Sequence, residues 1–198
     1  MQRINTKDED FETRLSEAIH NRGSDPHNPE IATRVESIIQ DIQRRGDDAL
    51  LSYAKQWDGI ASDAVLKSLE VSADEIDAAW EKVSAETIDA LQCAADRIQT
   101  FHVKQQEQGW SIDSDDGSRL AHRIVPLSRV GIYVPGGTAA YPSSVLMNAI
   151  PAHVAGVSEI IMTTPSPQGP IAPAVLAAAR IANVDRVFRV GGAQAVAA

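Results

Sequence analysis

The stretch 129-RVGIYVPGGTAAYPSSVLMNAIPAHVAGVSEIIMTT-164 decides the fold of this chain. A short apolar run at 130–134 ends in a Pro-Gly-Gly turn, and a second run at 159–162 follows a mostly apolar segment that begins near Pro142. Short apolar runs bounded by glycine and proline are typical of buried strands. A strand, a helix and a second strand in this order predict a βαβ unit with parallel strands.

The same unit is repeated further along the chain. An alanine-rich segment at 170–182 predicts a helix, 186–190 predicts a third strand, and Gly191-Gly192 opens another helical segment. The pairs Gly136-Gly137 and Gly191-Gly192 therefore follow the carboxyl ends of two strands, where doubly wound sheets bind their ligands. Glycine lets the backbone approach a ligand closely, and a helix N-terminus favours an anion. The GxGxxG fingerprint is missing, so the spacing alone does not decide between a ligand-binding role for these glycines and a role as simple turns.

Two polar side chains lie beside these glycine turns. Tyr133 ends the first predicted strand, where its ring and hydroxyl can stack on a ligand ring or hydrogen-bond a ribose or phosphate. Gln194 lies in the first turn of the last predicted helix, within reach of the strand ends. The alternatives are a core tyrosine with a satisfied hydroxyl and a helix-capping glutamine, and the residues alone do not choose between them.

The first part of the chain reads as helical, with one hairpin. Apolar residues recur at helical spacing in five segments before residue 103, and Ser72 to Glu75 fits a capping box at the start of one of them. Alternating apolar residues on either side of Asp116-Gly117 predict a β-hairpin. The prediction is an α/β chain with a helical region and hairpin at 1–127, followed by an incomplete Rossmann-like parallel sheet at 128–198.

Composition narrows the possible partners and the compartment. The net charge of −9 argues against a nucleic acid or an anionic membrane as partner. No apolar run approaches the ~18 residues that span a bilayer, and the charged N-terminus lacks the apolar region of a secretory signal. We therefore expect a cytoplasmic protein. The single cysteine, Cys93, excludes an internal disulfide, and its place among alanines on a predicted helix favours a buried, inert thiol.

The sequence offers no pattern of metal ligands or of a catalytic nucleophile. None of the five histidines pairs at ligand spacing with a histidine, the cysteine or a carboxylate, and HExxH, CxxC and GxSxG are absent. We therefore predict no metal site and no catalytic residue within this chain.

Several blocks resemble the N-terminal half of the histidinol dehydrogenases. The most specific are 131-GIYVPGGTAAYPSSVLMNAIPAHVAGV-157 and 187-VFRVGGAQAVAA-198, and three earlier blocks follow the same order: RRGDDALLSYAKQWDG, LEVSADEIDAA and RIQTFHVKQ. The resemblance implies a zinc-dependent, NAD-linked homodimer that oxidises L-histidinol to L-histidine through the aldehyde, at the end of histidine biosynthesis. It assigns NAD contacts to Tyr133 and Gln194, with Gly136 and Gly137 in the cofactor turn.

The resemblance covers only about half of a family chain. It places the zinc ligands and the general-base residues in the half that this sequence lacks, so we expect the chain alone to be inactive. Two alternatives stay open: a sister dehydrogenase that acts on another alcohol, and a non-catalytic assembly module that pairs with another subunit through the sheet edge after Val190.

Overall fold

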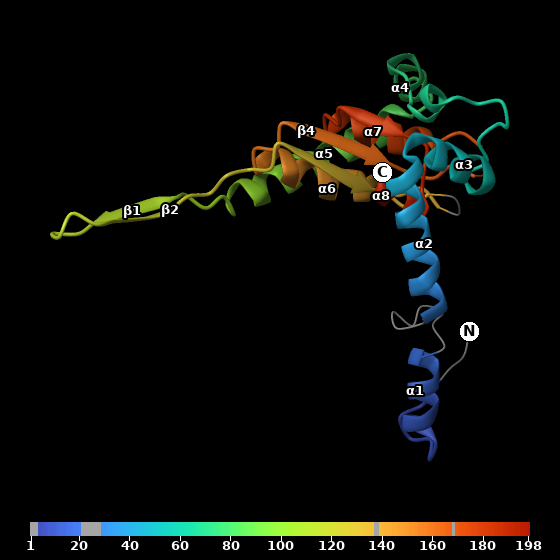
Figure 1. Ribbon diagram of the computed structural model, residues 1–198, viewed down its shortest axis with the longest axis horizontal. Helices are drawn as coiled ribbons and strands as arrows, with labels where there is room; N and C mark the ends of the chain where they lie inside the picture. The colour runs from blue at the N-terminus through green and yellow to red at the C-terminus, as the bar shows by residue number, and fades with distance from the viewer. Residues whose placement is uncertain (1–3, 21–28, 137–138, 168) are drawn as a thin grey trace.

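The computed structural model describes residues 4–20, 29–136, 139–167 and 169–198 of the chain. Helices and a short 3-10 turn precede a two-stranded hairpin, and a three-stranded parallel sheet with its helices follows (Figure 1). The elements are α1 (Phe11–His20), α2 (Pro29–Arg45), α3 (Asp47–Trp57), η1 (Leu66–Leu69), α4 (Ala73–Trp80), α5 (Ala85–Val103), β1 (Trp110–Asp113), β2 (Arg119–His122), β3 (Arg129–Tyr133), α6 (Pro142–Val154), β4 (Glu159–Thr163), α7 (Pro173–Ile181), β5 (Arg186–Phe188) and α8 (Gly192–Ala197). The predicted α/β class is confirmed.

The parallel sheet has the order β3-β4-β5 and forms as the βαβ pattern predicts. Arg129 is in register with Glu159, and Ile161 with Arg186. Helices α6 and α7 connect successive strands, and each begins with a proline in its first turn, where the missing N–H costs no helical hydrogen bond. All three strands therefore end at the same edge of the sheet, which makes that edge the place to look for a site.

The main core lies between one face of the sheet and helices α4 to α7. Its largest fully buried side chains include Leu146 of α6, Ile160 and Met162 of β4, and Val187 of β5. Val71 and Leu91, from the first part of the chain, belong to the same cluster. The core therefore crosses the boundary drawn at residue 127, and the division into two domains stays a prediction.

A second layer covers part of the other face of the sheet. Helix α8 packs on α2 and α3, and Leu69 and Val190 are buried in a small cluster with Ala54 of α3. On β3 the alternate residues Arg129, Gly131 and Tyr133 remain exposed on this side. Helices therefore lie on both faces, as doubly wound sheets require, but the β3 half of the second face is open.

The two outer edges of the sheet differ. The edge of β5 is bordered by the segment after η1, because Val71 N–H donates to Val187 O (2.8 Å) and Arg189 N–H donates to Leu69 O (2.7 Å). The outer edge of β3 pairs with no strand in the described parts of the chain. The expectation of an open edge after Val190 was therefore wrong, because a segment over a hundred residues upstream covers it.

The predicted hairpin forms, but it lies away from the main body (Figure 1). Trp110 pairs with His122 and Ile112 with Leu120, and every residue of both strands is exposed. Trp110, Ile112 and Leu120 are each more than half exposed. Their alternation predicts a covered face, yet nothing in the described residues covers it.

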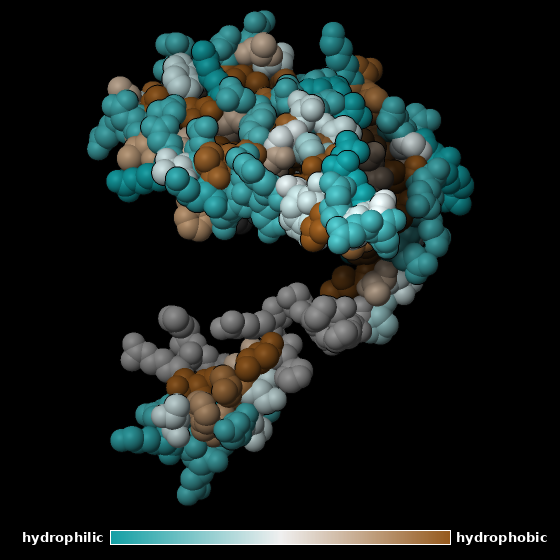
Figure 2. Space-filling model, turned by 90° about the vertical axis from the view of Figure 1, so that its left-hand side faces the viewer, coloured by the Kyte–Doolittle hydropathy of each residue, from teal (hydrophilic) through white to brown (hydrophobic). Residues whose placement is uncertain are grey.

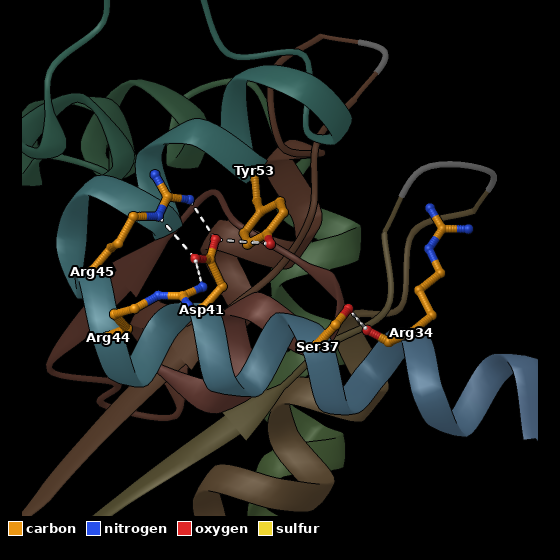
Figure 3. A network of polar contacts seen from close by, with 6 residues as sticks. All are labelled: Arg34, Ser37, Asp41, Arg44, Arg45 and Tyr53. Atoms are coloured by element: carbon orange, nitrogen blue, oxygen red, sulfur yellow. Dashed lines mark hydrogen bonds and ion pairs between the residues drawn. The ribbon is translucent and has the colours of Figure 1, made fainter.

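Helices α2 and α3 are joined by the carboxylate of Asp41 (Figure 3). It accepts hydrogen bonds from Arg44, Arg45 and the hydroxyl of Tyr53, the last at 3.0 Å. The two arginines and the tyrosine together hold the pKa of Asp41 well below its ordinary range. The Tyr53 ring stacks on Trp57 of the same helix at 4.7 Å. The guanidinium of Arg34 on α2 lies 5.5 Å from the centre of the Trp57 ring, which is a second contact between the two helices.

Cys93 is exposed, so the prediction of a buried thiol was wrong. The buried stripe of α5 contains Leu91 and Ala95. A residue two positions after Leu91 points to the opposite side of a helix, so Cys93 faces away from the core. The alanines near Cys93 lie on both the buried and the exposed side of α5, so their presence did not show which side Cys93 faces.

Helix α1 stands apart from the main body, and Figure 2 shows apolar side chains gathered on it. Ile19 is more than half exposed. None of the helices in the described ranges has the length and apolar character that a membrane crossing needs.

Candidate functional site

The turns at the carboxyl ends of the three strands pack on one another around Pro165. A Cβ added to Gly136 would lie 2.1 Å from the carbonyl oxygen of Pro165, and one added to Gly191 would lie 2.5 Å from the Pro165 side chain. Both glycines are therefore required by close packing between turns. Gly137, the fourth predicted cofactor residue, lies outside the described residues.

A cavity of about 290 Å³ opens between the ends of β3 and β4 and the start of α7. Gly136, Thr164, Ser166 and Ala172 are among its lining residues, and none of the described residues that line it carries a charged side chain. Thr164 is buried, and most of the other lining residues are small or apolar, Ile171 and Val175 among them. Such a cavity suits a flat, uncharged ring or a sugar better than it suits an ion.

Tyr133, the last residue of β3, points from the open face of the sheet toward the turn after β5. Its hydroxyl oxygen accepts a hydrogen bond from Gly192 N–H at 3.4 Å, and the residue is 40% exposed. The alternative of a core tyrosine is therefore wrong, since the ring is open to solvent. An exposed ring beside a strand-end turn is placed to meet a ligand.

Gln194 is buried rather than turned toward the outside of the sheet. It is 2% exposed, and its Nε2 donates to Asp58 Oδ2 at 3.3 Å. Its oxygen lies next to Gly192, where an added Cβ would be only 2.5 Å from Oε1. Gly192 has φ +66°, a conformation that favours glycine. Gln194 thus shapes the Gly191-Gly192 turn from behind.

Asp58 is a member of this group that the sequence patterns did not reveal. It follows the last residue of α3, is 3% exposed, and also accepts a hydrogen bond from Gly191 N–H at 3.2 Å. Burial raises the pKa of the Asp58 carboxyl, while the hydrogen bonds from Gly191 and Gln194 lower it. The only signal in the sequence was an Asp-Gly pair at a helix end, which usually marks a turn.

The structure thus brings Tyr133, Gly192, Gln194 and Asp58 to one turn, with Tyr133 on its outer side and Gln194 and Asp58 on its inner side. The cavity beside Gly136 is next to this turn but is lined by neither Tyr133 nor Gln194. No three histidine, cysteine or carboxylate side chains come together as a metal site within the described ranges.

Comparison with known proteins decides the family. The family model described as histidinol dehydrogenase matches residues 21–198. The chain belongs to the histidinol dehydrogenase family. The histidinol dehydrogenase of Geobacter sulfurreducens is 48% identical over 198 residues, which are all of this chain and 46% of that protein. The histidinol dehydrogenase of Syntrophotalea carbinolica is 49% identical over 199 residues, with 45% of its length covered.

A solved structure supports the same membership. The crystal structure of the histidinol dehydrogenase from Elizabethkingia anophelis matches with a TM-score of 0.75 and 37% identity, over 84% of this chain and 38% of that one. The chain therefore spans less than half the length of the histidinol dehydrogenases it matches. The family is one of NAD-dependent oxidoreductases, and its membership implies NAD and zinc as cofactors.

The described residues fit these two cofactors unequally. For NAD there are an exposed tyrosine, an uncharged cavity and close-packed glycine turns at one sheet edge. For zinc, the described ranges bring no set of ligands together. We therefore derive roles toward NAD from this chain and no step through zinc.

Proposed function

We propose that this chain is the NAD-binding portion of a histidinol dehydrogenase, the enzyme that oxidises L-histidinol to L-histidine through the aldehyde. The observation that carries the proposal is that Tyr133 and Gln194 adjoin the same turn from opposite sides, at the carboxyl edge of a parallel sheet. Ligands of open α/β sheets bind at this edge. Membership of the family supports NAD as the ligand.

Each residue has a separate role in the proposed site. The Tyr133 ring and hydroxyl contact the dinucleotide from the open side of the turn. Gly136 and Gly191 let the turns at the ligand edge pack closely together, because a side chain at either position would collide with Pro165. Gln194 meets NAD through the exposed backbone of Gly192, since its own amide group is directed inward. The bound nicotinamide supplies the hydride acceptor.

The residues that take the substrate proton and hold zinc belong, in this proposal, to the part of a full-length histidinol dehydrogenase that this sequence does not include. Assembly as a homodimer and location in the cytoplasm are part of the same proposal. A sister dehydrogenase with another alcohol as substrate differs only in that second part, so this chain does not distinguish the two.

Calorimetric titration with NAD tests the proposal directly. The chain should bind NAD, and it should gain histidinol oxidation only when the second half of a full-length relative, such as the Geobacter sulfurreducens protein, is supplied. If NAD binds neither to the chain alone nor to the chain with the second half supplied, the proposal is overturned. Oxidation of a different alcohol in preference to histidinol would support the sister dehydrogenase.

A second candidate function, a non-catalytic assembly module, is favoured by one observation. The outer edge of β3 pairs with no described strand, and the exposed hairpin β1-β2 precedes it directly. An unpaired edge is a template for another chain. Size-exclusion chromatography of the chain with and without the second half tests this candidate. A complex that forms without NAD binding would favour it, and a chain that ignores the second half would exclude it.

A further inference from the structure

Asp58 is a buried carboxylate whose two oxygens both serve the turn after β5. Oδ1 accepts from Gly191 N–H at 3.2 Å, and Oδ2 accepts from Gln194 Nε2 at 3.3 Å. These partners lie 133 and 136 positions further along the chain. Asp58 and Gln194 are each at most 3% exposed. The contact is therefore a specific link between the end of α3 and the proposed cofactor turn.

A carboxylate is a costly group for such a link. A buried charge is unfavourable unless it is fully hydrogen-bonded, whereas an amide or hydroxyl joins two loops at a lower cost. An ionised carboxylate differs from both because it only accepts hydrogen bonds. It therefore decides which end of the Gln194 carboxamide faces inward, namely the NH₂ group.

The orientation of Gln194 in turn determines the outer side of the turn. With Nε2 held by Asp58, Oε1 lies against Gly192 and occupies the space where a side chain there would begin. The N–H of Gly192 then points outward to the hydroxyl of Tyr133 at 3.4 Å. Asp58, Gln194, Gly192 and Tyr133 thus form one continuous series of contacts from the core to the open face of the sheet.

The loop that carries Asp58 also reaches a second strand-end turn. Asp58 N–H donates to Ala54 O at 2.9 Å, which ties the loop to α3. The next residue, Gly59, packs so closely on the turn after β4 that an added Cβ would lie 2.7 Å from Pro167 O. One short loop therefore holds the turns after β4 and β5 in a fixed relation.

We propose that Asp58 is a positioning residue of the cofactor site, which holds Gly191 to Gln194 in the shape that takes the dinucleotide. This inference rests on the proposed NAD-binding function. Asp58 is too deeply buried to touch the ligand, and it acts through the Gly191 amide and the Gln194 carboxamide. The competing explanation is a structural link whose loss affects stability and leaves the affinity for NAD unchanged.

The experiment compares Asp58→Asn and Asp58→Ala in the full chain, with Asp63→Asn as the matched control. Asp63 is an exposed carboxylate in the same loop, outside the contact series. Each variant is titrated with NAD, its Gly191 amide exchange is followed by NMR, and its unfolding in urea is measured. The exchange reports the link itself, while the titration reports its consequence for the ligand.

Asp58→Asn keeps one acceptor oxygen, so the fold should persist while NAD binding weakens by up to about tenfold, the net effect of one ordinary hydrogen bond. Asp58→Ala should weaken binding further and accelerate exchange at Gly191, and the order Asp, Asn, Ala should hold for affinity. Asp63→Asn should match the unsubstituted chain in all three measurements. If Asp58→Ala does not fold, the asparagine variant decides the question.

Faster Gly191 exchange with unchanged NAD affinity would overturn the positioning role and leave a structural link. Unchanged exchange would overturn the link itself. No NAD binding by the unsubstituted chain would instead overturn the proposed function, together with the cofactor role given to Asp58, and the exchange measurement would still show whether the link exists.

Discussion

Glu75 and Arg189, 114 positions apart in the sequence, form a two-oxygen ion pair at 2.7 and 2.8 Å. Glu75 also completes the capping box of α4, because its carboxylate accepts from Ser72 N–H at 3.0 Å while Ser72 Oγ accepts from Glu75 N–H at 3.2 Å. One side chain thus starts α4 and fastens it to the end of β5. Arg189 and Ser72 together lower the pKa of Glu75.

Replacement Glu75→Gln should lower the free energy of unfolding by about 1 kcal/mol, because the amide keeps part of the capping box and loses the charged contact with Arg189. The loss of stability is small because Glu75 is half exposed and solvent screens the ion pair with Arg189. Urea unfolding of both proteins at neutral pH measures the difference. Glu86→Gln, in the first turn of α5, is the control and should have almost no effect. Equal effects at both positions would show that the Arg189 contact contributes nothing.

The sequence predicted the local elements well because their causes are local. Apolar periodicity, the Ser72 capping box and the Asp116-Gly117 turn all act over a few residues, and each appears in the structure. The pairs Glu75–Arg189 and Asp77–Arg180 could not be predicted, since they join residues more than a hundred positions apart. The covered edge of β5 was missed for the same reason.

Only the part of the candidate site that lies at the ends of the strands could be predicted from the sequence. The strand-end rule placed Tyr133 and the glycine turns at the same sheet edge, although their contact with NAD stays a prediction. The inward direction of Gln194 depends on Asp58, which enters from α3. No periodic or motif signal connects a helix end to a turn 133 residues later, so Asp58 required the structure.

The pH dependence of stability should carry a signature of Asp58. Because burial raises its pKa in the folded state, the folded chain binds a proton more tightly than the unfolded chain just above the ordinary value of 3.8. Stability from this group is fully present below that value and falls as pH rises through the raised pKa. Asp41 and Glu75, with lowered pKa values, act in the opposite direction.

The difference in unfolding free energy between the unsubstituted chain and Asp58→Asn isolates the Asp58 contribution. We expect this difference to decrease from acidic toward neutral pH, as followed by urea unfolding at a series of pH values. An increase over the same range would mean that the hydrogen bonds from Gly191 and Gln194 outweigh burial.

The chain alone should not oxidise histidinol, with or without added zinc. The described ranges assemble no group of three potential ligands, and the chain spans 46% of the Geobacter sulfurreducens relative. The measurement is NADH formation by the purified chain, with the full-length relative as the positive control. NADH produced by the chain in proportion to its concentration would show that catalytic residues lie within it.

Tyr133→Phe should weaken NAD binding while leaving the fold intact. The hydroxyl is the only atom removed, and its contact with Gly192 N–H, at 3.4 Å, is long for a strong hydrogen bond. The free energy of unfolding should therefore change little.

Loss of one hydrogen bond to the ligand should cost about 0.5–1.5 kcal/mol, or up to roughly tenfold in affinity. Tyr53→Phe is the control, because the Tyr53 hydroxyl also makes one hydrogen bond, to Asp41 at 3.0 Å, but belongs to α3 and is not part of the proposed site. Titration with NAD and urea unfolding of both variants separate ligand contact from stability. Equal NAD affinity in the two variants would remove the Tyr133 hydroxyl from the proposed site and leave its exposed ring as the part of Tyr133 that can contact the cofactor.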